Sequence, residues 1–136
     1  MYEVFEHTAD LGLRIWAPEL TELFAEAARA LFSIIVENPD AVRPLQEREF
    51  AIEGEELDYL LFDWLNELLY TFDTKHILFV EFDIEMVEHG IRARVRGEPI
   101  DHKRHHLEHE VKAITYHGLK VERAGDRWMA EVIVDI

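Results

Sequence analysis

The chain has 136 residues, no cysteine, and 29 acidic residues against 14 lysines and arginines, so its net charge is −15. The missing cysteine excludes disulfides, cysteine zinc sites, thiolate nucleophiles and redox sensing, and the negative field disfavours strong direct nucleic-acid binding while it attracts cations and basic partners. Apolar residues make up 49% of the chain, so we expect residues 1–136 to form a single domain. No signal-peptide pattern and no apolar run of membrane-spanning length is visible, and we therefore expect a cytoplasmic protein that contacts no membrane.

Two strands and a helix are predicted in the first third of the chain. Residues 2–7 alternate loosely between apolar and polar side chains, and a turn at residues 8–12 leads to a second short strand at 13–17. Pro18 is typical of a helix start, and apolar residues follow it at helical spacing until an Asn-Pro-Asp sequence ends the pattern. The sequence predicts a helix at about residues 18–37.

The strongest periodic signal predicts a second helix at about residues 55–73, after a strand at 48–53. Its apolar residues recur at intervals of three and four, and they are Leu57, Leu60, Leu61, Trp64, Leu65, Leu68, Leu69 and Phe72. Tyr59, Phe62 and Tyr70 lie outside this stripe, so the helix is apolar around most of its circumference. We therefore expect it to be covered on more than one side, between two sheets.

The second half of the chain is typical of antiparallel strands. Residues 78–86 and 91–96 alternate apolar and polar side chains around His89 and Gly90, which fit a two-residue hairpin turn. That register predicts two charge pairs across the strands, Arg94–Glu85 and Arg96–Asp83. The arginine stripe is therefore interpreted as part of a charge-paired sheet face and not as an RNA surface.

Strands at residues 110–122 and 127–136 complete the predicted sheet. Helices and antiparallel strands are mixed irregularly and do not alternate as in a parallel doubly wound sheet. The sequence therefore predicts an α+β fold with mainly antiparallel sheets and two principal helices.

No common nucleotide-binding or hydrolase motif occurs in the sequence. Five of the eight histidines lie between residues 102 and 117. A short helix there would form two i, i+4 pairs at the spacing of zinc ligands, His102–His106 and His105–His109. Charged residues are interspersed, so the segment is instead interpreted as a solvated, partly ion-paired connector.

Two aspartates stand out by their context. Asp10 lies in a tight turn directly after a strand, where an Asx turn or a cap is an alternative interpretation. Asp135 is the penultimate residue of an apolar strand, so its carboxylate lies beside the main-chain carboxylate of Ile136. A hard cation such as Ca²⁺, Mg²⁺ or Mn²⁺ would relieve the repulsion between such oxygens, and a frayed, solvated terminus is the alternative.

Several stretches of the chain, taken together and in this order, resemble the archease family of small acidic proteins. They run from residue 7 to the last residue, and they are HTADLG at 7–12, LFDWLNELL at 61–69, GEPID at 97–101, RH at 104–105, EVKAITYH at 110–117 and VDI at 134–136.

The resemblance implies a protein that is not an enzyme but an activator of the RtcB-type tRNA-splicing RNA ligase. Such a protein promotes guanylylation of the ligase from GTP, allows multiple turnover and can broaden nucleotide use. The resemblance also implies a layered β/α/β fold. It assigns a divalent-cation site to the side chains of Asp10 and Asp135 and to the terminal carboxylate of Ile136, with a Ca²⁺-like ion and with Mn²⁺ or Mg²⁺ as the other choices.

Asp101, His105, Lys112 and His117 match another block of the family and are candidates for supporting the site or contacting the partner. Lys112 and His117 would orient the nearby carboxylates or touch a nucleotide phosphate, although strand alternation puts the two on opposite faces unless a bulge intervenes. Lys112 is the preferred one of the two. A sheet-stabilising pair between Glu110 and Arg104 is an alternative role for this block.

Two other functions compete with the activator. One is a small metal-dependent phosphoesterase that uses Asp10, Asp135 and the histidines, but neither a nucleophile nor a base is identifiable. The other is a general protein chaperone, for which the sequence shows no large exposed apolar stripe.

Overall fold

The computed structural model describes all residues from 1 to 136. In chain order its elements are β1 (Tyr2–His7), β2 (Asp10–Ala17), α1 (Leu20–Ile35), the 3₁₀ helix η1 (Pro39–Ala41), β3 (Gln46–Glu53), α2 (Leu57–Lys75), β4 (Ile77–Val87), β5 (Gly90–Pro99), β6 (Ala113–Ile114), β7 (Lys120–Ala124) and β8 (Arg127–Asp135). Every strand pair is antiparallel, and the predicted α+β class is confirmed. Neither α1 nor α2 is long and apolar enough to cross a membrane.

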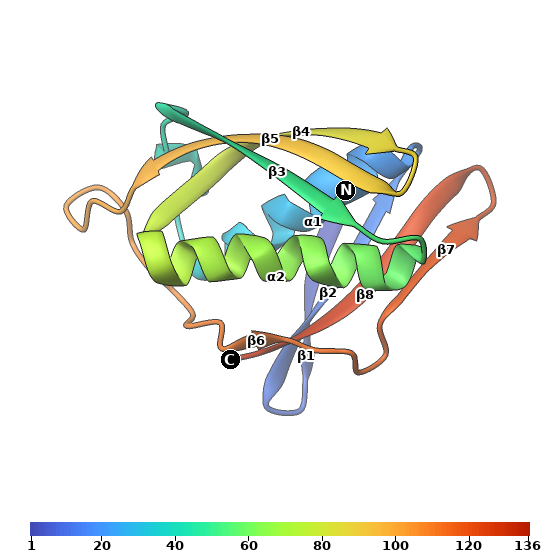
Figure 1. Ribbon diagram of the computed structural model, residues 1–136. Coiled ribbons are helices and arrows are strands. Elements are labelled where there is room, and N and C mark those ends of the chain that lie inside the picture. The colour runs from blue at the N-terminus through green and yellow to red at the C-terminus, as the bar shows by residue number, and fades with distance from the viewer.

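Both helices lie between two sheets (Figure 1). One sheet has the strand order β3-β5-β4, and the other has the order β1-β2-β8-β6, with β7 also paired to β8. Helix α1 contacts β2 and β8 of one sheet and β4 of the other, and α2 contacts β3 and β4 on one side and β6 and β7 on the other. The predicted β/α/β layering is confirmed.

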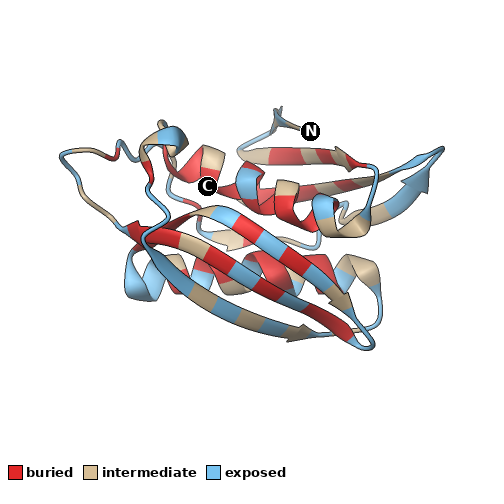
Figure 2. Ribbon diagram, turned by 90° about the horizontal axis from the view of Figure 1, so that it is seen from above, coloured by how far each residue is buried: buried red, intermediate tan, exposed pale blue.

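A single apolar core of 34 buried residues fills the space between these layers. Buried and exposed residues alternate along β4 and β5, as expected for strands with one face toward the core (Figure 2). Trp64 of α2 is fully buried, and its Nε1 donates a hydrogen bond to the carbonyl oxygen of Phe24 in α1 at 3.0 Å. Its ring also meets the edges of Phe50 from β3 and Phe82 from β4, so Trp64 joins both helices to one sheet.

The helices differ slightly from their predicted ends. Helix α1 begins at Leu20 because Glu19 has an extended backbone, and it ends at Ile35 because Val36 is extended and forms an isolated bridge with Leu107. Helix α2 continues to Lys75, where His76 closes it in the left-handed conformation. The periodic apolar pattern therefore located both helices, and the backbone conformations of Glu19, Val36 and His76 set these ends.

Helix α2 is covered on more than one side, as expected, but its outward flank is exposed. Tyr59 and Tyr70 are 53% and 61% exposed, and Phe62 is half-buried. The two sheets cover the helix from either side, and neither reaches this third flank (Figure 1).

The predicted turn of the β4–β5 hairpin is misplaced by one residue, so the predicted cross-strand partners are wrong by two residues. Its turn contains Glu88 and His89, and Gly90 already belongs to β5 with a φ of 154°. The observed partners across the strands are Asp83–Arg94, Glu85–Arg92 and Glu81–Arg96. Opposite charges still face each other, and β3 supplies further partners for the arginines, so the charge-paired sheet face is confirmed.

The strand predicted at residues 110–122 is broken in two. β6 pairs with the end of β8 and β7 with its beginning, both on the same edge, and residues 115–119 form the irregular connection between them. Gly118 in this connection has a φ of 63°, which glycine adopts without strain.

Replacing Trp64 tests this packing. Trp64→Ala should lower the free energy of unfolding by about 3–5 kcal/mol, because it opens a cavity where both helices meet the β3-β5-β4 sheet. Urea denaturation followed by circular dichroism measures the change. Tyr70→Ala, on the exposed flank of the same helix, should change stability by less than about 0.5 kcal/mol. Equal losses in both variants would contradict the assigned role of Trp64.

Candidate cation site

Strand pairing in the larger sheet brings the two predicted aspartates side by side. His7 pairs with Asp10 across β1 and β2, and Leu11 pairs with Val134 across β2 and β8. Continuing this register by one residue sets Asp10 opposite Asp135. Residues that are directly opposite in antiparallel strands share a face, so His7, Asp10 and Asp135 form a row across three strands. The alternate residues of the two strands, such as Leu13 and Val132, are fully buried and occupy the other face, which packs on the helices.

The two aspartate carboxylates have no protein partner. Asp10 and Asp135 are half-buried, and neither side chain forms a hydrogen bond or an ion pair. On the same face, by contrast, Arg14 binds Glu131 at 2.7 Å. Asp10 already belongs to β2, so the Asx-turn and cap interpretations are wrong. Asp135 lies in β8 and pairs with Ala113, so it is not part of a frayed end.

Two histidines lie beside the two aspartates, one within the row and one next to it. The ring centroids of His7 and His117 are 5.1 Å apart, and the Nδ1 atom of His7 is buried without a hydrogen-bond partner. The turn between β1 and β2 contains Thr8 with a φ of 55°, a backbone conformation that a β-branched residue rarely adopts. Sequence reasoning gave His7 no role, because only the pairing of β1 with β2 shows that it lies opposite Asp10.

Lys112 and His117 reach this end of the sheet in different ways. The Lys112 amide donates to the main-chain oxygen of Asp135 at 2.7 Å, but its exposed side chain forms no ion pair. The His117 side chain instead packs against His7. The Lys112 side chain therefore makes no contact that supports the preference for it over His117. The His117 ring, in contrast, lies directly beside the row.

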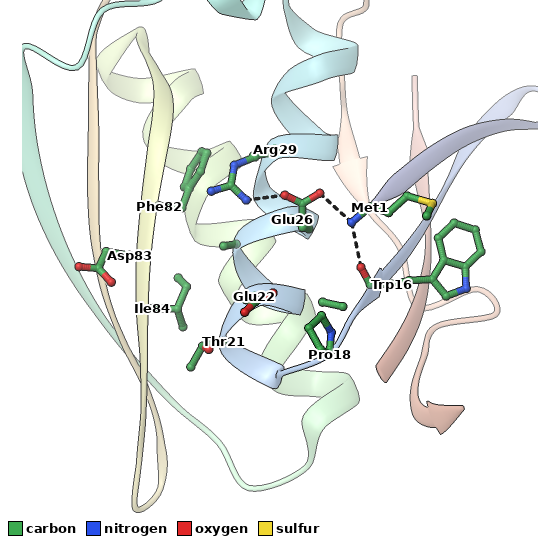
Figure 3. A pocket seen from close by; sticks show the side chains of 12 residues that line it. Met1, Trp16, Pro18, Thr21, Glu22, Glu26, Arg29, Phe82, Asp83 and Ile84 are labelled. Carbon is green, nitrogen blue, oxygen red and sulfur yellow. Dashed lines mark hydrogen bonds and ion pairs between the residues drawn. The ribbon is translucent and has the colours of Figure 1, made fainter. Parts of the chain in front are cut away.

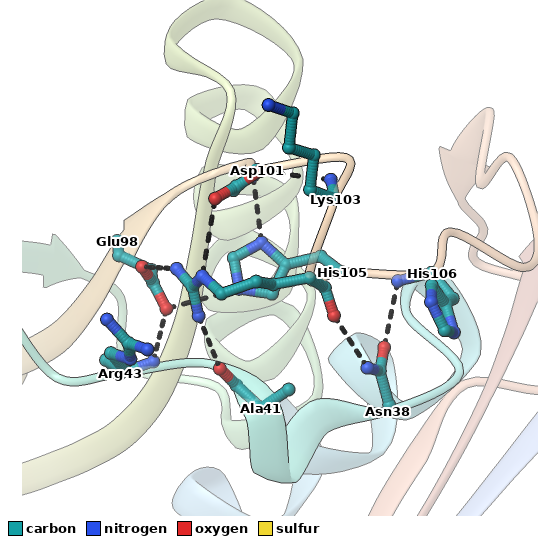
Figure 4. Close-up of polar contacts among 9 residues, drawn as sticks. Asn38, Ala41, Arg43, Glu98, Asp101, Lys103, His105 and His106 are labelled. Atoms are coloured by element: carbon teal, nitrogen blue, oxygen red, sulfur yellow. Dashed lines mark hydrogen bonds and ion pairs between the residues drawn. The ribbon is translucent and has the colours of Figure 1, made fainter.

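Asp101 and His105 belong to a separate cluster (Figure 4). His105 is 2% exposed, its Nδ1 accepts the Asp101 amide at 2.9 Å, and its Nε2 lies 3.1 Å from Oε2 of Glu98. Because Nδ1 accepts a hydrogen bond, the ring hydrogen lies on Nε2 and is donated to Glu98. Both ring nitrogens are occupied, so His105 is not free to bind a metal ion. Residues 102–104 form a turn and not a helix, and the two zinc-type histidine pairs do not form.

Glu98 is the central acceptor of this cluster and is 4% exposed. The Arg104 guanidinium binds one of its oxygens, and the Arg43 amide donates to the other at 2.6 Å. Burial alone raises the pKa of the Glu98 carboxyl, but the hydrogen bonds from Arg104, Arg43 and His105 outweigh burial and hold this pKa below its ordinary value of 4.5. Sequence reasoning missed Glu98, because an isolated glutamate in an alternating strand carries no signal of burial.

The Glu98 cluster fixes the loop that leads to β6. Arg104 pairs with Asp101 at 3.3 Å and not with the predicted Glu110. Asn38 bonds the main chain of this loop at two points, both at 2.9 Å. Two amides further along the loop donate to the last carbonyls of α1, which have no partner within the helix. The structure thus places Asp101 and His105 in the contacts that hold this loop and not at the candidate site.

A hollow of about 460 Å³ lies at the other end of the β1–β2 hairpin (Figure 3). Glu26 accepts from Arg29 at 2.5 Å and from the ammonium group of Met1 at 3.1 Å, and this ammonium also donates to the Trp16 carbonyl oxygen at 2.9 Å. The charged groups of this hollow are therefore already paired with one another. The hollow contains none of the predicted cation ligands.

The donors at the candidate site suit a hard cation. Asp10, Asp135 and the main-chain carboxylate of Ile136 offer only oxygen atoms, which Ca²⁺, Mg²⁺ and Mn²⁺ prefer. No group of three or more histidine, aspartate or glutamate side chains is placed so that it could hold a metal ion. These residues would therefore hold an ion with few ligands and leave coordination positions open to water or to a partner.

Comparison with known proteins gives one answer over the whole chain. The sequence model of the archease protein family (MTH1598/TM1083) matches residues 2–136. The chain is 45% identical over 139 residues to protein archease of Methanopyrus kandleri, which covers 99% of both chains. The chain belongs to the archease family. It is also 43% identical to protein archease of Pyrococcus abyssi, over 99% of this chain and 98% of that protein.

Two solved structures share the fold. The solution structure of Methanobacterium thermoautotrophicum protein 1598 has a TM-score of 0.81 at 32% identity and covers 99% of this chain and 98% of that chain. The crystal structure of an archease from Thermotoga maritima, described as a possible chaperone, has a TM-score of 0.70 at 26% identity and covers 100% of this chain and 98% of that chain.

The Glu98 cluster predicts a stability difference in this archease-family chain. Glu98→Gln should lower the free energy of unfolding by about 3 kcal/mol at neutral pH, because it removes one partner of a buried ion pair. The lowered pKa means that ionised Glu98 stabilises the fold fully above the unfolded value of 4.5, and that this stabilisation is lost as the pH falls through the folded pKa.

Urea unfolding at about pH 6 and about pH 3 tests both statements. The variant should lose less stability than the wild type between the two conditions. Glu85→Gln is the matched control, since Glu85 is exposed and forms no ion pair. The assignment is contradicted if the Glu98→Gln curve runs parallel to the wild-type curve.

Proposed function

We propose that this chain is a non-catalytic activator of an RtcB-type tRNA-splicing RNA ligase, promoting its guanylylation and multiple turnover and broadening its nucleotide use. The observation that carries the proposal is the row of Asp10 and Asp135 at one end of a sheet, without protein partners, in a chain that belongs to the archease family. These are the residues to which the family resemblance assigns a cation site.

Charge supports a ligase as the partner. An enzyme that joins RNA ends presents basic groups to phosphates. A protein with a net charge of −15 is attracted to such a surface and repelled by the RNA itself. The activator is therefore proposed to act on the protein and not to bind RNA strongly.

The cation belongs to this proposal. Asp10, Asp135 and the Ile136 terminal carboxylate would hold a divalent ion with oxygen ligands, and such an ion supplies positive charge and open coordination positions. His117 is proposed to cover the His7 side of the row, and Lys112 to contact the partner. Asp101 and His105 are proposed to support the site from a distance through the loop that they anchor.

The two competing functions have less support. A phosphoesterase needs a nucleophile or an activated water beside its metal, and the few convergent ligands at the site do not suggest one. A general chaperone agrees with the description of the Thermotoga maritima relative as a possible chaperone. A phosphatase assay and an aggregation assay with an unrelated client separate these functions from ligase activation.

Ligase turnover tests the proposed function. With ligase limiting and with GTP and a divalent ion present, added wild-type protein should convert excess RNA substrate that the ligase alone leaves unjoined. Asp10→Asn should abolish this stimulation, whereas Asp126→Asn in the exposed β7–β8 turn should retain it. The proposal fails if wild-type protein changes neither turnover, nor guanylylation, nor nucleotide choice.

Asp10→Asn should also lose ion binding without losing stability. Asp10→Asn should weaken divalent-ion binding at least tenfold in isothermal titration calorimetry. In metal-free buffer it should melt at the wild-type temperature or slightly above, because one of two facing, unpaired like charges is removed. A clear loss of stability in metal-free buffer would show that Asp10 has a structural role instead.

Blocking the terminal carboxylate tests the third ligand. A peptide extension after Ile136 converts its carboxylate into an amide and should weaken ion binding at least tenfold. An extension before Met1 is the control, because Met1 lies at the other end of the β1–β2 hairpin. β1 has six residues, so at the usual rise per residue of a strand Met1 is about 20 Å from the candidate site. Unchanged ion affinity after the C-terminal extension would remove Ile136 from the ligand set.

A further inference from the structure

The uncovered flank of α2 carries an exposed aromatic cluster next to the candidate cation site. Tyr59 and Tyr116 are 53% and 59% exposed. The Tyr116 ring stacks on Phe62 with centroids 4.0 Å apart and an interplanar angle of 16°, and it meets the edge of Tyr59 at 5.8 Å. We call Tyr59, Phe62 and Tyr116 the aromatic cluster. Its two tyrosines expose large ring surfaces that no part of this chain covers.

The cluster is held in place before any partner arrives. Tyr116 lies in the connection between β6 and β7, where Thr115 donates two hydrogen bonds to the Ile133 carbonyl oxygen, from its amide at 3.0 Å and from its hydroxyl at 2.9 Å. The His117 amide in turn donates to the Thr115 hydroxyl oxygen at 3.2 Å. Rigid tyrosine side chains give much contact area for little lost conformational entropy, which is why they dominate many protein interfaces.

The cluster and the cation site share one short segment. Tyr116 packs against α2, and the next residue, His117, packs against His7, which pairs with Asp10. A partner that covers Tyr116 is therefore brought to the end of the sheet where Asp10 and Asp135 lie.

The negative charge around the aromatic cluster favours a partner with basic side chains. Helix α2 contains four acidic residues and a single basic one, Lys75 at its last position. Asp63 is exposed, lies one turn after Tyr59, and forms no ion pair. An arginine can stack its guanidinium on a tyrosine ring while it binds a carboxylate through two hydrogen bonds. A second copy of this chain would bring a net charge of −15 against another −15, and RNA would bring phosphates, so neither fits this surface as well.

We infer that the aromatic cluster, together with Asp63, is the surface that docks an arginine-bearing face of the partner ligase and so sets the cation site against it. This inference rests on the proposed function and adds the docking surface to it. The cluster supplies affinity, and the aspartates supply the effect on the ligase.

Binding and activation measured on the same variants test the inference. Tyr59→Ala and Tyr116→Ala should each raise the dissociation constant for the purified ligase at least tenfold in biolayer interferometry. Ion binding by calorimetry should stay within twofold of the wild type, and stimulation of ligase turnover should return at saturating concentrations of the variant. Asp63→Lys should weaken binding and reduce its dependence on salt concentration.

Three controls keep the result interpretable. Tyr116→Phe preserves the ring and should bind within threefold of the wild type. Tyr70→Ala lies on the same flank of α2, about 16 Å along the helix from Tyr59, and should bind within twofold. Asp10→Asn should still bind the ligase while it fails to activate it.

The possible failures are distinguishable. If wild-type protein neither binds nor activates the ligase, the proposed function is wrong and this docking surface falls with it. If wild-type protein binds and activates but Tyr59→Ala and Tyr116→Ala bind equally well, the docking surface is wrong and the proposed function stands. Binding of a single-stranded RNA oligonucleotide that both variants lose would overturn the inference in favour of an RNA surface.

Discussion

Strand β8 has partners along both edges, and this pairing determines what lies at the end of the larger sheet. β2 occupies one edge, and β6 and β7 follow each other along the opposite edge. The alternating buried residues of β2 and β8 pin the register, because a slip of one residue would turn them all away from the helices. The same register sets Asp10 beside Asp135. Packing of the apolar face thus holds side by side two like charges that repel each other.

The protein treats its buried and its half-buried carboxylates differently. Glu98 is enclosed, and its oxygens receive hydrogen bonds from two arginine residues and a histidine, as a buried charge requires. Asp10 and Asp135 receive none, although they lie on the same sheet face as the fully paired Arg14 and Glu131. The first arrangement stabilises a loop. The second leaves negative charge available for a ligand, which is the physical basis of the proposed cation site.

The sequence located most elements but not the contacts that involve two distant segments. The periodicity of residues 57–72 predicted a helix between two sheets, and Asp10 and Asp135, which the sequence singled out separately, are brought side by side by the pairing of β2 with β8. The β4–β5 turn was misplaced, because Gly90 suits a hairpin turn as well as the first position of a strand. The burial of Glu98 and the position of His7 depend on pairing between segments far apart in the chain. The reason for a glycine at position 12 is visible only in the structure, because the Phe5 ring lies where a side chain at this position would clash.

Paramagnetic broadening by Mn²⁺ in an amide NMR spectrum tests the central claim most directly, namely that the paired ends of β2, β8 and β6 form a cation site. Substoichiometric Mn²⁺ should first broaden the amide signals of Asp10, Leu11, Ala113 and Asp135, and an excess of Ca²⁺ should restore them. Signals from the charged outer face of β3, β4 and β5 should remain sharp. Broadening that spreads over that acidic face, or that spares Asp10 and Asp135, would contradict the account.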